Sequence, residues 1–137
     1  MARQITLAQA ESIIEACKAE AQTVGQPMNI AVVDDGGNLV AFCSMDGTKL
    51  IGVDISQKKA LTAVYFQTDS RDLVPLVQPG QPLYGIESTT EGRLVVFGGG
   101  VLLKTASGEV AGGVGVSAGS VEQDHQVAEA GRKAFAG

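Results

Sequence analysis

The sequence contains no tryptophan, and only two tyrosines and four phenylalanines are present among its 137 residues. Its core must therefore be built mainly from Val, Ile, Leu and Ala, with 18 glycines that allow close packing. Hydrophobic residues make up 45% of the chain and charged residues 18%, which excludes a disordered protein. At this length we expect one domain, spanning residues 1–137.

Basic residues are also scarce, since 10 Lys and Arg stand against 15 Asp and Glu, for a net charge of −5. Nucleic-acid binding depends on Lys and Arg that neutralise phosphates, so this balance argues against a nucleic-acid partner and against an anionic membrane surface. No apolar run reaches the roughly 18 residues of a membrane span, and no signal peptide is visible. We therefore expect a cytoplasmic protein.

Few residues of the types that bind metals or act as nucleophiles are present: two cysteines, Cys17 and Cys43, and one histidine, His125. Two cysteines form no disulfide framework, and we interpret both as reduced. One histidine and two distant cysteines do not predict a zinc site, and no Ser-His-Asp triad can be inferred. A group of acidic residues could gather in the fold, although spacing alone does not show it: Asp46, Asp54, Glu122 and Asp124.

Two helices carry clear start signals. Thr6 and Gln9 have the spacing of a capping box, and so do Ser120 and Gln123, which predicts that helices begin directly after Thr6 and after Ser120. Gly25 is a natural residue to end the first helix, because glycine adopts the left-handed conformation found there. Two further helices are expected between these, one over about 50–66 and a short one over about 70–77.

The strand signals fall into hairpins rather than into alternating strand–helix units. Expected strands cover residues 28–34, 39–43, 93–97, 101–104 and 109–116. Because the helices come before, between and after these hairpins, the order predicts an α+β fold. We expect one five-stranded, mainly antiparallel sheet with helices on both faces.

The triple glycine Gly98, Gly99 and Gly100 follows an expected strand but opens no helix, so it is not a dinucleotide-binding motif. It predicts either a kink between strands or a close approach of the backbone to a flat ligand or a second subunit. Glycines in the strand over 109–116 weaken it, which makes sense if a helix or another backbone lies close against it.

Five further residues allow both a structural and a functional interpretation. Ser117 and Gly119 precede the last helix, whose N–H groups could hold a carboxylate, unless Ser120 simply caps the helix. His125 is either a solvated helix residue or an axial haem ligand, and Cys17 is either a buried core residue or a thiolate ligand. Lys59 either lies on a solvated face or pairs with a ligand carboxylate.

Several segments, read together, resemble the GlcG/HbpS family of small haem-binding proteins. They are AVVDDGGNLVAF, SMDGTKL, VDISQKKALTA, VQPGQPLYGI, GRLVVFGGGVLL and GGVGVSAGSVEQDHQVAEAG. The match runs in order through nearly the whole chain. This family includes the C-terminal domain of PduO-type corrinoid adenosyltransferases and stand-alone proteins encoded with glycerol and diol utilisation enzymes.

The resemblance implies a profilin-like α/β/α sandwich with a five-stranded antiparallel sheet, haem as cofactor and a homo-oligomer of dimers or larger rings. Two positions depart from the family pattern: Leu102 stands where proline is common, and Ala118 where glycine is usual. Matching motif positions are Asp46, Gly47, Asp54, Lys59, Ala60, Pro79, Gly80, Tyr84, Gly85, Gly98, Gly99, Gly100, Gly115, Ser117, Gly119, Glu122, Gln123 and Asp124.

The leading hypothesis is therefore a non-catalytic, oligomeric protein that binds haem or a related tetrapyrrole. Alternatives are an enzyme or accessory protein of corrinoid-dependent glycerol or diol metabolism, and a structural oligomerisation module. Lys59, Arg93 or Lys104 could meet the haem propionates. Candidate cofactor-binding residues are Lys59, Gly98, Gly99, Gly100, Ser117, Gly119, Glu122, Cys17 and His125.

Overall fold

The computed structural model describes residues 3–135. Its elements are α1 (Leu7–Val24), β1 (Asn29–Asp34), β2 (Leu39–Ser44), α2 (Gly52–Phe66), the 3₁₀ helices η1 (Ser70–Leu76) and η2 (Ile86–Thr90), β3 (Gly100–Lys104), β4 (Val110–Ser117) and α3 (Val121–Lys133). This order confirms the predicted α+β class. Within residues 3–135, every helix is too short or too polar to cross a membrane.

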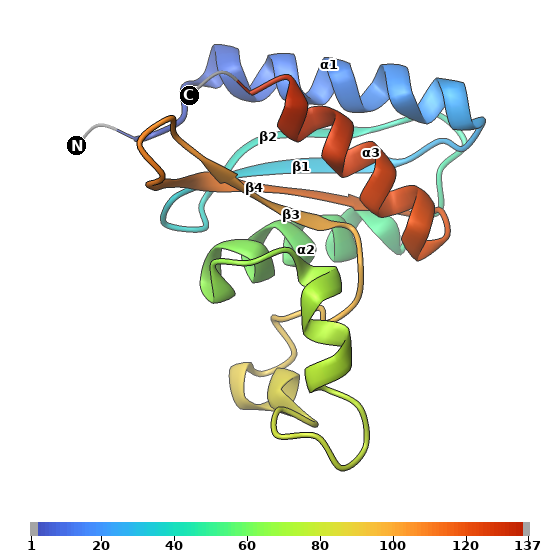
Figure 1. Ribbon diagram of the computed structural model, residues 1–137. Coiled ribbons are helices and arrows are strands. Elements are labelled where there is room, and N and C mark those ends of the chain that lie inside the picture. Colours follow the sequence, from blue (N-terminus) through green and yellow to red (C-terminus); the bar gives the residue numbers. More distant parts are fainter. Residues whose placement is uncertain (1–2, 136–137) are drawn as a thin grey trace.

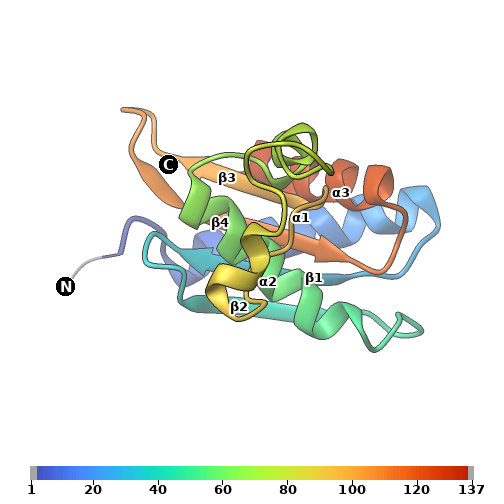
Figure 2. The same cartoon turned by 90° about the horizontal axis from the view of Figure 1, so that it is seen from below.

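The strands form one antiparallel sheet in the order β2-β1-β4-β3. Helices α1 and α3 lie side by side on one face of the sheet, and α2 lies on the other (Figure 1). Seen from the α2 side, this helix runs across the middle of the sheet (Figure 2). The segment between α2 and β3 also lies on this side. Helices therefore cover both faces of the sheet, as predicted, with α1 and α3 on one face and α2 and this segment on the other.

The prediction of five strands is wrong, because residues 93–97 form no strand and the described part of the chain contains four. Leu94 and Val95 are nevertheless buried. The Val95 N–H donates to Thr62 Oγ1 on α2 at 2.9 Å, so a helix side chain takes the place of a neighbouring strand. The apolar run therefore packs beside α2 instead of extending the sheet.

Both predicted capping boxes are confirmed. The Gln9 N–H donates to Thr6 Oγ1 at 3.1 Å, and the Thr6 N–H donates to Gln9 Oε1 at 2.8 Å. Ser120 and Gln123 make the equivalent pair at 3.2 and 3.0 Å. Gly25 ends α1 in the left-handed conformation, with φ at 76°, as predicted. The helix expected from about residue 50 begins at Gly52.

The face of the sheet toward α1 and α3 carries the main hydrophobic core. Alternate residues of β1 and β4 point to this side and are fully buried: Ile30, Val32, Val114 and Val116. They pack against residues of α1 and α3 that include Ile13. Large aliphatic side chains therefore hold this layer together.

The face toward α2 is lined by small residues. A Cβ at Gly113 would come within 2.6 Å of the Ala60 carbonyl oxygen, and a Cβ at Gly115 would overlap the Ser56 carbonyl oxygen. These strand glycines let the backbone of α2 approach the backbone of β4, which confirms the expectation that a helix lies close against the strand. Such proximity leaves little room for aliphatic side chains.

Candidate functional site

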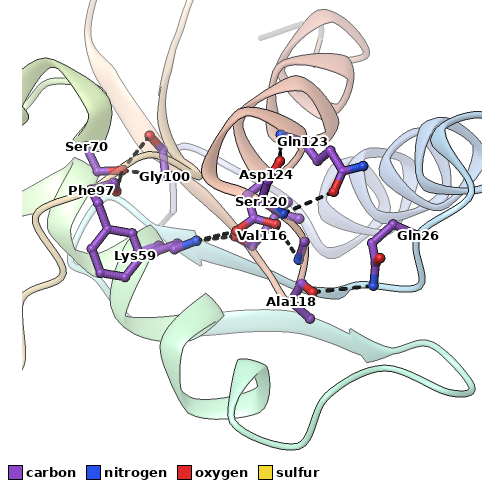
Figure 3. Close-up of polar contacts among 11 residues, drawn as sticks. Gln26, Lys59, Ser70, Phe97, Gly100, Val116, Ala118, Ser120, Gln123 and Asp124 are labelled. Atoms are coloured by element: carbon purple, nitrogen blue, oxygen red, sulfur yellow. Dashed lines mark hydrogen bonds and ion pairs between the residues drawn. The ribbon is translucent and has the colours of Figure 1, made fainter.

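A buried ion pair joins α2 to α3 across the end of β4. Lys59 Nζ lies 2.8 Å from Asp124 Oδ2, and the two side chains are 0% and 3% exposed. The ammonium also donates to the Val116 carbonyl oxygen at 2.9 Å, and the Gly119 N–H donates to Asp124 Oδ1 at 2.9 Å (Figure 3). Both charges are thus hydrogen-bonded, as buried charges must be to persist.

Burial opposes both charges of this pair. It lowers the pKa of Lys59 and raises the pKa of Asp124, and in each case the opposite charge only partly offsets the effect. The interpretation of Lys59 as a solvated residue is therefore wrong. Since its ammonium is already engaged inside the protein, Lys59 does not present it at the surface.

The triple glycine makes room for this lysine. Gly99 has φ at 126°, and a Cβ there would lie 2.6 Å from Lys59 Nζ, while a Cβ at Gly100 would overlap the Lys59 carbonyl oxygen. The Gly100 N–H donates to Ser70 Oγ at 2.9 Å. Gly99 and Gly100 therefore allow a close approach of backbone to α2.

Phe97 connects the ion pair to the surface. Its ring centroid lies 5.1 Å from Lys59 Nζ, within the range of a cation–π contact. Figure 3 shows the ring alongside the lysine side chain. Phe97 is also 41% exposed, so the same ring reaches both the buried ammonium and the outside of the protein.

Beside Phe97 lies a pocket of about 570 Å³, hereafter the Phe97 pocket. This volume falls within the range of small-molecule sites, and aromatic and aliphatic side chains supply much of its lining. Its lining residues are Arg71, Val74, Pro75, Phe97, Gly98, Val121, Glu122 and His125. It combines the apolar walls and the few polar groups that ligand sites require.

His125 has an unmet hydrogen-bonding capacity at this pocket. Its Nδ1 is buried, and among residues 3–135 it has no hydrogen-bond partner. Burial, together with the charge of Arg71, lowers the pKa of His125. The imidazole is therefore neutral at pH 7, which is the state in which histidine binds metals. A buried polar atom without a partner in a native fold calls for an explanation, and a ligand is one.

The structure brings together some of the residues that the sequence singled out. Gly98, Glu122 and His125 line the Phe97 pocket, while Lys59 contacts the Phe97 ring. The other candidates do not line this pocket. Gly99 and Gly100 pack against Lys59, Gly119 holds Asp124, and Ser117 is buried with its carbonyl oxygen facing Gly52.

Cys17 lies elsewhere, fully buried between α1 and α3, where its Sγ faces Gly131. Burial raises the pKa of this thiol to about 12. At neutral pH it is protonated, whereas a thiolate is the form that ligates iron. The position and protonation of Cys17 thus favour its interpretation as a core residue.

The three residues expected to meet propionates do not line the Phe97 pocket. Lys59 is engaged with Asp124, and Arg93 Nη1 donates to Tyr65 Oη at 3.0 Å beside a separate pocket. Lys104 lines a third pocket. Arg71 is the cation at the Phe97 pocket, and sequence reasoning missed it. Its three-residue spacing from Val74 was the available signal, since residues so spaced share one helix face.

The acidic residues that could have gathered do not do so. Within the part of the chain that the structure describes, no three His, Cys, Asp or Glu side chains come together to hold a metal ion. Asp54 instead pairs with Lys58 at 2.8 Å on the surface of α2, and Asp124 pairs with Lys59. These carboxylates are structural partners of lysines.

Comparisons with known proteins identify the family. The model of the family described as "Haem degrading protein HbpS-like" matches residues 5–133. An uncharacterised 15.0 kDa protein of the dhaT-dhaS intergenic region of Citrobacter freundii is 42% identical over 91% of this chain and 87% of its own length. The corrinoid adenosyltransferase PduO of the same organism is 37% identical over 93% of this chain, but this chain spans only 38% of it.

Solved structures agree with these matches. The Klebsiella pneumoniae protein ORFY superimposes with a TM-score of 0.94 at 36% identity, covering 98% of this chain and 92% of its own. A PduOC:heme complex superimposes with a TM-score of 0.91 at 35% identity, covering 95% and 94%. Because the family model spans almost every described residue and the folds coincide, this chain belongs to the HbpS-like family.

Proposed function

We propose that this protein binds haem or a related tetrapyrrole in the Phe97 pocket, with His125 as the iron ligand. The observation that carries the proposal is His125, which lines an apolar pocket and whose buried Nδ1 lacks a partner among the described residues. A neutral imidazole suits iron, and rings and aliphatic side chains suit a flat macrocycle. The structure of a PduOC:heme complex with the same fold supports the choice of ligand.

Each residue of the pocket then has a defined task. His125 would offer a nitrogen lone pair to the iron, while Phe97, Val74 and Val121 would pack against the macrocycle and exclude water. Lys59 holds Phe97 in place through its ammonium. When bound, haem would supply the iron to which the His125 imidazole binds. These residues bind and shield the group, as expected of a non-catalytic protein.

A haemin titration followed by the Soret band tests the proposal. We expect a saturable shift of the band at micromolar protein, and His125→Ala should change the spectrum because the iron would lose its imidazole ligand. Cys17→Ala is the matched control, because this thiol is buried and protonated, and its spectrum should match that of the parent protein. The absence of a saturable shift would refute haem binding.

The pH dependence of the same spectrum gives a second test. Protonation removes the lone pair that binds iron, and the pKa of His125 lies below its ordinary value near 6.5. The iron–imidazole spectrum should therefore be retained at pH 6.5 and lost only on further acidification. A spectrum that changes fully above pH 6.5 would contradict this assignment.

Self-association is part of the proposal, because large apolar side chains are exposed next to α2. Leu50 is 86% exposed and Ile51 is 67% exposed, although both are costly to leave in water. A homo-oligomer, a dimer or a larger even assembly, would cover them. Light scattering should show a mass that is an even multiple of 14.1 kDa. A monomer at micromolar concentration would contradict this expectation.

A second candidate function is an enzymatic one. The family description names haem degradation, and the matched region of PduO belongs to a corrinoid adenosyltransferase. Incubating the haem-loaded protein with ascorbate as reductant and dissolved oxygen as oxidant separates these functions, because catalysed degradation would bleach the Soret band faster than in free haemin under the same conditions, whereas simple binding would not. Competition by cobalamin against haemin would instead favour the corrinoid alternative.

A further inference from the structure

We propose that Arg71 is the carboxylate-binding residue of this protein, and that it orients an amphiphilic ligand with its acidic groups outside the Phe97 pocket. This inference rests on the proposed function, because it assumes a ligand in that pocket. It adds the residue that recognises the ligand's acid groups and the direction in which the ligand lies.

Two neighbouring hollows meet at Arg71. Besides the Phe97 pocket, a groove of about 630 Å³ runs along α3, and Arg71 and His125 line both. The other residues of this groove are polar or small: Glu20, Gln126, Glu129, Ala130, Arg132 and Lys133. A ligand with an apolar body and polar arms could place its body in the first hollow and its arms in the second.

Several polar side chains along the groove are already paired or hydrogen-bonded to other protein groups. Arg132 Nη2 donates to Asp69 Oδ2 at 2.9 Å, and Arg132 is also paired with Glu129. Gln126 Nε2 donates to Glu20 Oε2 at 2.7 Å. Arg71, in contrast, makes no hydrogen bond or ion pair with any described residue. Its guanidinium keeps its full hydrogen-bonding capacity for a ligand.

The signs of the remaining charges give the direction. Glu122 lines the Phe97 pocket but not the groove, and Lys133 lines the groove but not the pocket. A ligand carboxylate is repelled at the Glu122 side and attracted at the side of Arg71 and Lys133. Arginine binds a carboxylate through two parallel N–H donors, which fixes its orientation as well as its position.

The test compares haemin with haemin dimethyl ester, whose two carboxylates are blocked, in one detergent buffer. Arg71→Gln should weaken haemin binding by roughly 10- to 100-fold, as expected for lost hydrogen bonds to a charged group, and leave ester binding unchanged. Arg71→Lys should restore part of the loss. Arg93→Gln is the matched control, because it removes the same charge beside a separate pocket, and it should change neither affinity.

The outcomes separate the two proposals. If the parent protein binds both ligands but Arg71→Gln weakens neither, or weakens both equally, the assignment of Arg71 is overturned while haem binding stands. If neither ligand produces a saturable Soret shift, both proposals fail together. Octanoate serves as a simple carboxylate competitor without a tetrapyrrole ring. If it competes with haemin in the parent protein but not in Arg71→Gln, the assignment of Arg71 as a carboxylate-binding residue is also supported.

Discussion

The two faces of the sheet are packed by different means. Toward α1 and α3, aliphatic side chains such as Ile30 and Val116 fill the space between the layers. Toward α2, glycines bring backbone against backbone, and the buried groups include several polar ones: Asn29, Ser56, Lys59, Thr62 and Ser70. The first face is a conventional core, whereas the second depends on close approach and on satisfied polar groups.

This difference explains where the candidate site lies. A layer of interlocking aliphatic side chains leaves no unpaired polar group, while a polar layer must pair each one. The buried Lys59 ammonium is paired with Asp124, and it also contacts the ring of Phe97, which lines the surface pocket. The pocket therefore lies next to the place where the buried ion pair joins α2 to α3.

The largest expected effect comes from Lys59→Met, which leaves Asp124 buried without its partner. We expect a loss of about 3–5 kcal/mol in the free energy of unfolding, measured by urea denaturation at pH 7. Lys58→Met is the control, because its pair with Asp54 is at the surface, and it should cost less than about 1 kcal/mol. Equal losses in both variants would contradict the role of burial.

The same variant should respond to pH. Without Lys59, the pKa of Asp124 is raised further above its unfolded value near 3.9, because burial is no longer offset. A raised carboxyl pKa gives stability that is present at low pH and lost as pH rises through the folded pKa. Lys59→Met should therefore lose stability, relative to the parent protein, as the pH increases from 4 to 8.

A smaller effect is expected from adding one methyl group to the α2 side. Gly115→Ala places a Cβ against the Ser56 carbonyl oxygen, so α2 must move away from β4. We expect a loss of about 1–3 kcal/mol in thermal or urea unfolding. Gly36→Ala is the control, since its Cβ would meet side-chain atoms of Asn38 at 3.0 Å and Asp34 at 3.5 Å but no backbone atom, and its stability should change little.

Removing one methylene from the opposite face sharpens the comparison. Ile30→Val should cost about 0.5–1.5 kcal/mol, because aliphatic neighbours can partly close the small gap. The two faces would then be destabilised by opposite changes. Added atoms would destabilise the α2 face, and removed atoms would destabilise the α1/α3 face. If Ile30→Val cost more than Gly115→Ala in urea denaturation, this contrast would fail.

The smallest predicted change is a gain in stability. Ala118, which stands where the family usually has glycine, has φ at 115°, a conformation that favours glycine. Ala118→Gly should relieve this strain and raise the free energy of unfolding by about 0.5 kcal/mol, since part of the gain is offset by the greater freedom of glycine in the unfolded chain. A lower midpoint of urea unfolding would contradict the prediction.

Local signals predicted the elements well, because caps and turns depend on residues a few positions apart. The capping boxes at Thr6 and Ser120 and the left-handed Gly25 are all found as expected. The run over residues 93–97 predicts a strand because β-branched residues are enriched in strands, but here Leu94 and Val95 are buried outside the sheet. The hydrogen-bond partner of Val95, Thr62, lies 33 positions away in the sequence, and no local pattern could reveal it.

By itself, the sequence determined the α+β class, the ends of the main helices and the family, because these depend on short-range spacing and on motifs preserved in order. Only the tertiary structure decided that Lys59 pairs with Asp124, 65 residues away, and that Arg71 and His125 share a pocket. Contacts between residues far apart in the sequence depend on how the helices and the sheet pack. Two residues 65 positions apart can lie at many different distances in space, so the sequence separation does not predict the contact.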